Sequence, residues 1–176
     1  DVNESMPGKA YYALPQAERS ALSAKPKIDT HIYARENGWA IRGLAAYLSA
    51  TGDTAALDAA KIAAEWIVKN RKLEGGGFAH GDADRGGPFL GDTLAMGQAA
   101  LELYAATGDR NWMTLAIEAG GFIAAIFKDT SGGLLTSVQS EANAGVFTKP
   151  AKIPEEQIQT ARFASLLHRY SGVQEY

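Results

Sequence analysis

The sequence predicts an all-α protein made of repeated α/α hairpins that form part of an (α/α) toroid. Three observations support this fold class: a phrase that recurs later in the chain, apolar residues spaced as on one helix face, and a Gly-Asp pair at each helix break. The recurring phrases are LSATGDTAALDAAKIAA and YAATGDRNWMTLAIEAG, at residues 48–64 and 104–120. Each phrase is predicted to be the corner of one hairpin.

The first hairpin is predicted over residues 30–70. Its first helix has an apolar stripe at i, i+3, i+4 and i+7, formed by Ile41, Leu44, Ala45 and Leu48. Gly52 ends this helix, and Asp53 is a good N-cap for the next. The second stripe consists of Leu57, Ala60, Ala64 and Ile67. The turn is short, so the two stripes are expected to bury each other.

A second hairpin is predicted over residues 91–128, and a fifth helix over about 154–171. The third helix starts near Asp92. For this residue a role as the N-cap of the helix is the alternative to a catalytic role. Trp66 and Trp112 are both expected on buried stripes of the outer helices. Between the hairpins, residues 72–89 hold six glycines and predict a long loop.

The chain is expected to contain an irregular lead-in over residues 1–28, with one helical turn around 16–24, followed by a toroid fragment over 29–176. The fifth helix has no predicted partner after it, and the sequence lacks an initiating Met, so we expect a piece of a longer protein. An incomplete ring leaves apolar hairpin flanks uncovered. Self-association through these flanks is therefore predicted.

Composition excludes several classes of partner. The net charge of −3 and the pI near 5.6 argue against binding to nucleic acid or to an anionic membrane surface. No apolar run approaches the ~20 residues of a membrane span, and the first residues do not resemble a signal peptide. We therefore expect a soluble protein, with a cytoplasmic location favoured. The absence of cysteine excludes disulfides and thiolate chemistry, and no cofactor is predicted.

Several runs of residues resemble one family. KIDTHIYARENGWAIRGLAAYLSATGD, GGGFAHGD, FLGDTLAMGQAALELYAATGD and FKDTSGGLLTS are similar to the helical toroid region of spermatogenesis-associated, thioredoxin-domain-containing proteins of the YyaL type. The matching positions are Asp29, the Asn37-Gly38 pair, Asp92, and Asp129 with Gly132-Gly133. The resemblance covers about residues 25–136. It implies an α/α toroid related in shape to six-hairpin glycosidases and N-acylglucosamine 2-epimerases.

This sequence departs from the family pattern in two places. The family's thioredoxin-like portion, with its cysteines, is missing, so the resemblance implies no redox activity for this chain. The second inner-helix motif usually has two adjacent acids and a tyrosine, whereas here it is Gly91-Asp92-Thr93.

Candidate catalytic residues lie near the predicted starts of the inner helices. Glu36 and Asp92 are separated by the same interval as the two recurring phrases, so they are equivalent in the repeat. Two carboxylates that face one cavity could act as general acid and general base on a sugar. His80 and His31 are the histidines near these helix starts, and histidine transfers protons near neutral pH. We predict a catalytic role for Glu36, Asp92 and His80, and place His31 with the substrate. A solvated helix face and a surface loop remain the alternatives.

The glycine-rich loop also carries Asp82, Asp84 and Arg85, which could tune His80. The spacing of Asp82 and Asp84 is similar to the start of a calcium loop, but Thr93 occupies the position where such a loop needs a glutamate. No Lys follows the glycines as in a phosphate-binding loop. No metal site is predicted.

The substrate-binding residues are predicted to be Asn37, Trp39 and Arg42, together with His31. Trp39 lies near the start of an inner helix, where an aromatic face could stack on a sugar ring, and Arg42 follows one turn later. Pairing of Arg42 with a neighbouring acid is the alternative.

Two functions are compatible with these patterns. The first is a pocket for a carbohydrate-like small molecule, with epimerase, isomerase or glycosidase chemistry in the complete protein and no activity in the fragment alone. The second is a non-catalytic scaffold for a thioredoxin-like domain or a partner protein. A single concave site that gathers the candidate residues would favour the first.

Overall fold

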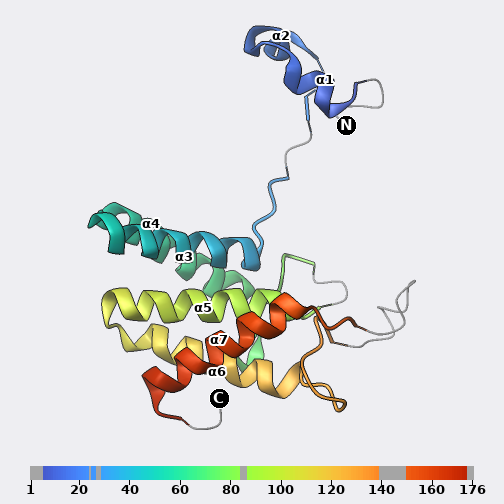
Figure 1. Ribbon diagram of the computed structural model, residues 1–176. Helices are drawn as coiled ribbons and strands as arrows, with labels where there is room; N and C mark the ends of the chain where they lie inside the picture. The colour runs from blue at the N-terminus through green and yellow to red at the C-terminus, as the bar shows by residue number, and fades with distance from the viewer. Residues whose placement is uncertain (1–5, 24, 27–28, 84–86, 139–149, 174–176) are drawn as a thin grey trace. The chain divides into compact units, whose positions relative to one another are not determined.

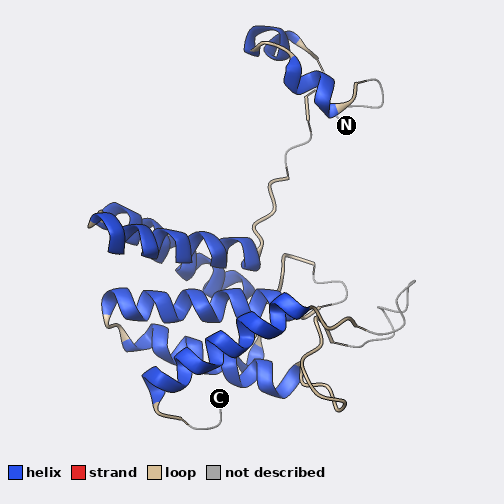
Figure 2. Ribbon diagram, viewed as in Figure 1, coloured by secondary structure: helices blue, strands red, loops and turns tan. Residues whose placement is uncertain are grey.

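Every regular element in the described part of the chain is a helix (Figure 2). The computed structural model describes residues 6–23, 25–26, 29–83, 87–138 and 150–173. The chain divides into two units, Asp1–His31 and Ile32–Tyr176. No helix among these residues is both long and apolar enough to cross a membrane. The all-α prediction is confirmed.

The first unit contains two short helices, α1 (Gly8–Ala13) and α2 (Gln16–Ala21). The sequence pattern predicts only one helical turn here, so α1 is additional. Pro7 and Pro15 each directly precede a helix. Proline breaks a helix from within but is compatible with its entry, where no amide hydrogen bond is lost. Each of these prolines therefore precedes a helix that would not be predicted if every proline were counted as a helix breaker.

The described residues of the second unit form five long helices and one short 3-10 turn. They are α3 (Ala34–Thr51), α4 (Thr54–Arg71), η1 (Glu74–Gly76), α5 (Leu90–Thr107), α6 (Arg110–Ile126) and α7 (Pro154–Ser171). The step from the start of α3 to that of α5 equals the interval of the sequence repeat, and so does the step from α4 to α6. The third helix begins two residues before Asp92, which is inside its first turn.

The corners of the two hairpins have the same geometry. Gly52 and Gly108 adopt left-handed conformations with φ of 74° and 70°, which glycine enters without a steric cost. Asp53 and Asp109 then cap the outer helices, each accepting a hydrogen bond of 2.9 Å from the amide two residues later. The repeated Thr-Gly-Asp therefore ends one helix and starts the next.

The loops after the hairpins repeat as well. Isolated bridges join Lys72 to Phe78 and Lys128 to Leu134, again separated by the interval of the repeat. Beyond each bridge, a backbone carbonyl accepts a hydrogen bond from the first amide of the hairpin's own inner helix. The carbonyl of His80 accepts from Ala34 at 3.0 Å, while that of Thr136 accepts from Leu90 at 2.8 Å.

Helix α5 lies at the centre of the second unit, in contact with α3, α6 and α7 (Figure 1). Leu101 on α5 is only 4% exposed, and Leu44 on α3 packs against the same core. Small residues allow α3 and α5 to approach closely. A Cβ atom placed on Gly38 would lie 2.8 Å from the backbone carbon of Ala95.

One prediction about the core is wrong. Trp112 is buried on α6 as expected, but Trp66 on α4 is 38% exposed and has the guanidinium of Arg71 5.1 Å from its ring centre. The neighbouring Ile67 takes the fully buried position. An outer helix has only one covered face, so a shift of one residue moves a side chain from that face towards solvent.

The close contact at Gly38 predicts a specific loss of stability. Gly38→Ala should lower the free energy of unfolding by ~1–3 kcal/mol, because the new methyl group meets the α5 backbone and cannot be accommodated by a side-chain rotation. Gly43→Ala is the matched control, since nothing lies within 4 Å of a Cβ at that site of the same helix. It should be neutral or stabilise by up to ~1 kcal/mol. Chemical denaturation measures both; equal effects would contradict the close packing.

Candidate functional site

The buried carboxylate of Asp92 links the starts of α3 and α5. Asp92 is the third residue of α5, and its side chain is 2% exposed. One oxygen, Oδ1, accepts a 2.9 Å hydrogen bond from the backbone amide of Arg35 in the first turn of α3. The same oxygen lies 2.9 Å from Nδ1 of His80. Asp92 therefore caps the neighbouring helix rather than its own.

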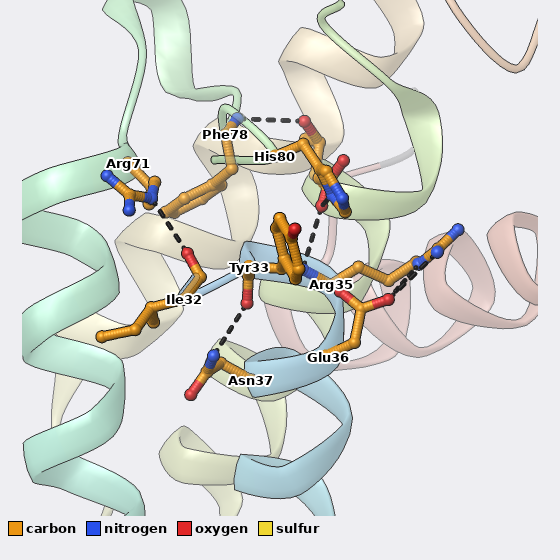
Figure 3. A network of polar contacts seen from close by, with 10 residues as sticks. Ile32, Tyr33, Arg35, Glu36, Asn37, Arg71, Phe78 and His80 are labelled. Atoms are coloured by element: carbon orange, nitrogen blue, oxygen red, sulfur yellow. Dashed lines mark hydrogen bonds and ion pairs between the residues drawn. The ribbon is translucent and has the colours of Figure 1, made fainter. Parts of the chain in front are cut away.

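His80 is held on several sides. Its carbonyl accepts from Ala34, and its ring stacks on Tyr33 with the centroids 4.4 Å apart and the planes 12° apart (Figure 3). Phe89 approaches the ring edge-on at 6.1 Å. The side chain is nevertheless 31% exposed. A ligand can therefore reach this histidine, while the ring has little freedom to turn.

The contact with Asp92 determines what the His80 ring can do. An ionised carboxylate only accepts hydrogen bonds, so Nδ1 must carry the proton that it donates to Asp92. In the neutral ring, Nε2 then holds the lone electron pair. This is the arrangement in which a carboxylate orients a histidine for general base work.

The environment of Asp92 raises the pKa of its carboxyl above the ordinary value of 3.8. Burial is the largest cause, because a charged carboxylate loses its hydration there. The hydrogen bond and charge of His80, followed by the amide and charge of Arg35, act in the opposite direction. The His80 contact thus offsets part of the cost of burying the charge.

Glu36 adds a second carboxylate to this cluster. It is the third residue of α3, and its Oε1 accepts from Nε and Nη2 of Arg35 at 3.1 and 3.0 Å (Figure 3). Its other oxygen, Oε2, is buried and has no hydrogen-bond partner among the described residues. Donor atoms of Glu36, His80 and Asp92 lie within 4.8 Å of one another. These three could hold a metal ion; the hydrogen bond between His80 and Asp92 accounts for the closeness of two of them.

A groove of about 290 Å³ is lined by Arg35, the partner of Glu36, and by Gly91, the neighbour of Asp92, but not by the three cluster residues themselves. Its walls come from α3, α5 and α7 and include Trp39, Arg42, Gln98, Glu156 and Gln159. Trp39 is 56% exposed, and the guanidinium of Arg35, another lining residue, lies 5.3 Å from its ring centre. The groove thus combines an aromatic face with charged and amide groups that include both hydrogen-bond donors and hydrogen-bond acceptors.

The predicted substrate-binding residues are not all brought together. Trp39 and Arg42 line the groove, and Arg42 donates to Oε1 of Gln98 at 2.7 Å rather than to an acid. Asn37 uses its side-chain amide to bond the carbonyl of Tyr33 at 2.8 Å, as an internal helix contact. His31 belongs to the first unit, where its ring lies 2.5 Å from Asp29.

One of the acids predicted to tune His80, Asp82, has another partner. Asp82 pairs with Arg71 at 2.8 Å, and Arg71 also donates to the carbonyl of Ile32 at 3.2 Å. Asp84 and Arg85 lie outside the described residues. Among the described residues, the carboxylate that bonds the His80 ring is that of Asp92.

Glu156 is a site residue that the sequence patterns do not reveal. It is the third residue of α7, the same position that Glu36 and Asp92 hold in α3 and α5. The step from the start of α5 to that of α7 is longer than the interval of the repeat, so the repeat does not expose the equivalence. Counting from the helix start at Pro154, rather than along the repeat, would have found it.

Solved structures of carbohydrate enzymes share this fold. No family model and no curated protein matches the chain. A family 76 glycoside hydrolase (mannosidase) from Bacteroides thetaiotaomicron VPI-5482 is 18% identical with a TM-score of 0.72, over 89% of this chain and 44% of that protein. A family 76 α-mannanase from Bacteroides thetaiotaomicron is 20% identical with a TM-score of 0.70, over 87% and 44%.

An epimerase is similar to the same degree. The cellobiose 2-epimerase from Spirochaeta thermophila DSM 6192 is 18% identical with a TM-score of 0.68, over 85% of this chain and 41% of that protein. At such identities the likeness establishes the α/α toroid fold. The chain spans less than half the length of each of them.

The raised pKa of Asp92 predicts how stability depends on pH. Below about pH 3.8 the carboxyl is protonated in the folded and the unfolded chain. As pH rises, the unfolded chain releases this proton at a lower pH than the folded chain does. The stability that the protonated carboxyl contributes is therefore lost as the pH rises through the pKa of the folded state. The stability of the wild type relative to Asp92→Asn should therefore fall from pH 3 to pH 6. Denaturant titrations at each pH measure this difference, and an unchanged or rising difference would contradict it.

Proposed function

We propose that this chain forms part of a carbohydrate site at which His80, oriented by Asp92, takes a proton from the substrate. The reaction class is sugar epimerisation or isomerisation, carried out by the complete toroid. The observation that carries the proposal is the 2.9 Å contact between Nδ1 of His80 and the buried Asp92, which leaves Nε2 as the reactive atom. The groove with Trp39 and Arg42 would hold the remainder of the sugar.

Several features support a histidine base over a pair of carboxylates. A glycosidase needs two carboxyl groups that both reach the sugar, with a separation of about 5–9.5 Å. Asp92 is 2% exposed, and its Oδ1 is bonded to Arg35 and His80, so its role is to orient His80. Glu36 would act beside it as a second polar contact to the substrate. The fold shared with mannosidases and epimerases is compatible with either class.

The proposal extends to the finer family membership. The motifs around Asn37-Gly38 and Gly132-Gly133 favour a YyaL-type protein, in which this toroid would accompany a thioredoxin-like domain. The scaffold function stays as the competing hypothesis. It predicts that no sugar binds the groove.

The reaction class can be tested in deuterium oxide. The full-length natural protein would be incubated with mannose, glucose, mannobiose and cellobiose, and the products followed by proton NMR. Epimerisation through a proton transfer exchanges the hydrogen on the carbon next to the carbonyl for deuterium. Release of a monosaccharide without exchange would favour a glycosidase, and no change in any sugar would refute the proposal.

The His80 side chain gives a prediction that is independent of substrate. In the neutral ring, the proton should be on Nδ1 and absent from Nε2, because the buried Asp92 accepts it. Long-range nitrogen–proton NMR of the labelled chain distinguishes the two tautomers. A ring protonated on Nε2 would be incompatible with the proposed base.

Replacement of His80 should remove most of the activity. A positioned general base contributes roughly 10²–10⁴-fold to the rate, so His80→Gln should lower kcat by about this factor while KM changes little. His168→Gln is the matched control, since His168 near the end of α7 contacts the carbonyl of Val173 and does not line the groove. Its kcat should stay close to the wild-type value; similar losses in both variants would argue against a specific role.

The self-association expected from uncovered flanks remains a prediction. Ile158, Leu166 and Tyr170 on α7 are 55%, 42% and 49% exposed, and a second copy of the chain would cover this face. Light scattering over a tenfold range of concentration should detect dimers in the wild type. They should weaken in Ile158→Lys, whereas a monomer at every concentration would contradict the prediction.

A further inference from the structure

The three inner helices place a carboxylate at the same position. Glu36, Asp92 and Glu156 are the third residues of α3, α5 and α7. Asp92 is bonded by His80, and the Thr136 side chain interacts with Glu156 and lowers the pKa of that carboxyl. His80 and Thr136 are equivalent, since their carbonyls accept from the first residues of α3 and α5. Glu156 and Thr136 therefore occupy positions that correspond to those of Asp92 and His80 one hairpin earlier.

Glu156 differs from Asp92 in what it faces. It lines the groove beside Trp39 and Arg42, whereas Asp92 is enclosed. Its Oε2 is buried without a hydrogen-bond partner among the described residues. Its Oε1 would lie 3.2 Å from a Cβ atom on Gly91, so a glycine there leaves room for the carboxyl. Glu156 and His80 thus contact adjacent residues in the first turn of α5, Gly91 and Asp92.

The groups around Glu156 favour its protonated form. Burial is the largest cause and raises its pKa above the ordinary value of 4.5. The Thr136 hydrogen bond and the positive charge of Arg35 on α3 lower the pKa, while the negative charges of Asp92 on α5 and Glu155 on α7 raise it. The α7 dipole alone would stabilise the ionised carboxylate. A purely structural first-turn acid would therefore be expected to titrate like an exposed glutamate or below it.

We propose that Glu156 is the proton donor of the site and gives its proton to an oxygen atom of a ligand held in the groove. This inference depends on the proposed function, in which Nε2 of His80 takes a proton from carbon. The C–H electron pair becomes the new C=C bond, the carbonyl π pair moves onto oxygen, and that oxygen receives the Glu156 proton. His80 then returns a proton to the neighbouring carbon in an isomerisation, or to the opposite face of the same carbon after the intermediate has turned in an epimerisation. Glu156 regains its proton from the oxygen that becomes the carbonyl of the product, so both side chains are restored. No oxidant or reductant is required.

Glu156→Gln tests the donor role, and Glu65→Gln is the matched control. Glu156 lines the groove, whereas Glu65 on α4 is exposed and does not line it. In the full-length protein, with whichever of the four sugars reacts, Glu156→Gln should lower kcat by roughly 10²–10⁴-fold with KM changed only a few-fold. The Glu65→Gln variant should retain wild-type kcat.

The pH profile separates a proton donor from a structural residue. The wild-type rate should fall as pH rises through the Glu156 pKa, because the carboxyl loses the proton that it donates. The residual rate of Glu156→Gln should lack this decline. A variant that keeps the wild-type kcat, or the same decline, would overturn the proposal.

Direct titration of Glu156 adds a test without substrate. Carbon-13 NMR of the side-chain carboxyl, assigned with Glu156→Gln, should give a midpoint above the ordinary glutamate value of 4.5. A midpoint at or below 4.5 would overturn the donor role even if sugars react. If a sugar reacts and His80→Gln abolishes the reaction while Glu156→Gln does not, only the donor role fails; if no sugar reacts, the proposed function fails and the donor role with it.

Discussion

One carboxylate oxygen determines the arrangement at this end of the second unit. Oδ1 of Asp92 accepts from the backbone of α3 and from the ring of His80, and so joins two helices and a loop at a single atom. An ionised carboxylate in a dry site is costly unless such bonds are present. Loss of either partner would leave charge without compensation. The position of the loop, the stacking on Tyr33 and the direction of the His80 ring all follow from this contact.

The two ends of the inner helices differ in what their polar side chains bond to. At their C-terminal ends, the Thr-Gly-Asp corners use a left-handed glycine and a capping aspartate, and their side chains bond to the local backbone. At their N-terminal ends, the third position holds an acid, and the acid of α5, Asp92, bonds to α3 and to the loop that carries His80. The helix dipole favours negative charge at such ends, which makes them suitable places for carboxylates. The residues that form the hairpin corners and the candidate catalytic residues therefore lie at opposite ends of the inner helices.

The sequence predicts the hairpins well because their signals are local. Apolar spacing and the repeated corner residues depend only on neighbours along the chain, and the equivalence of Glu36 and Asp92 follows from the constant interval of the repeat. The burial of Asp92 and its bond to α3 could not be predicted, because they depend on how two helices pack. Glu156 was hidden by a connection of different length. Trp66 shows that helical periodicity locates a buried face only to within one residue.

The loop carbonyls explain how such a site can be varied. At His80 and at Thr136 the backbone oxygen closes the hairpin onto its own inner helix, and this bond is indifferent to the side chain. An imidazole and a hydroxyl consequently occupy matching places in one chain, each directed to an acid of the following inner helix. A ring of such modules can exchange reactive groups one position at a time without any change in its architecture.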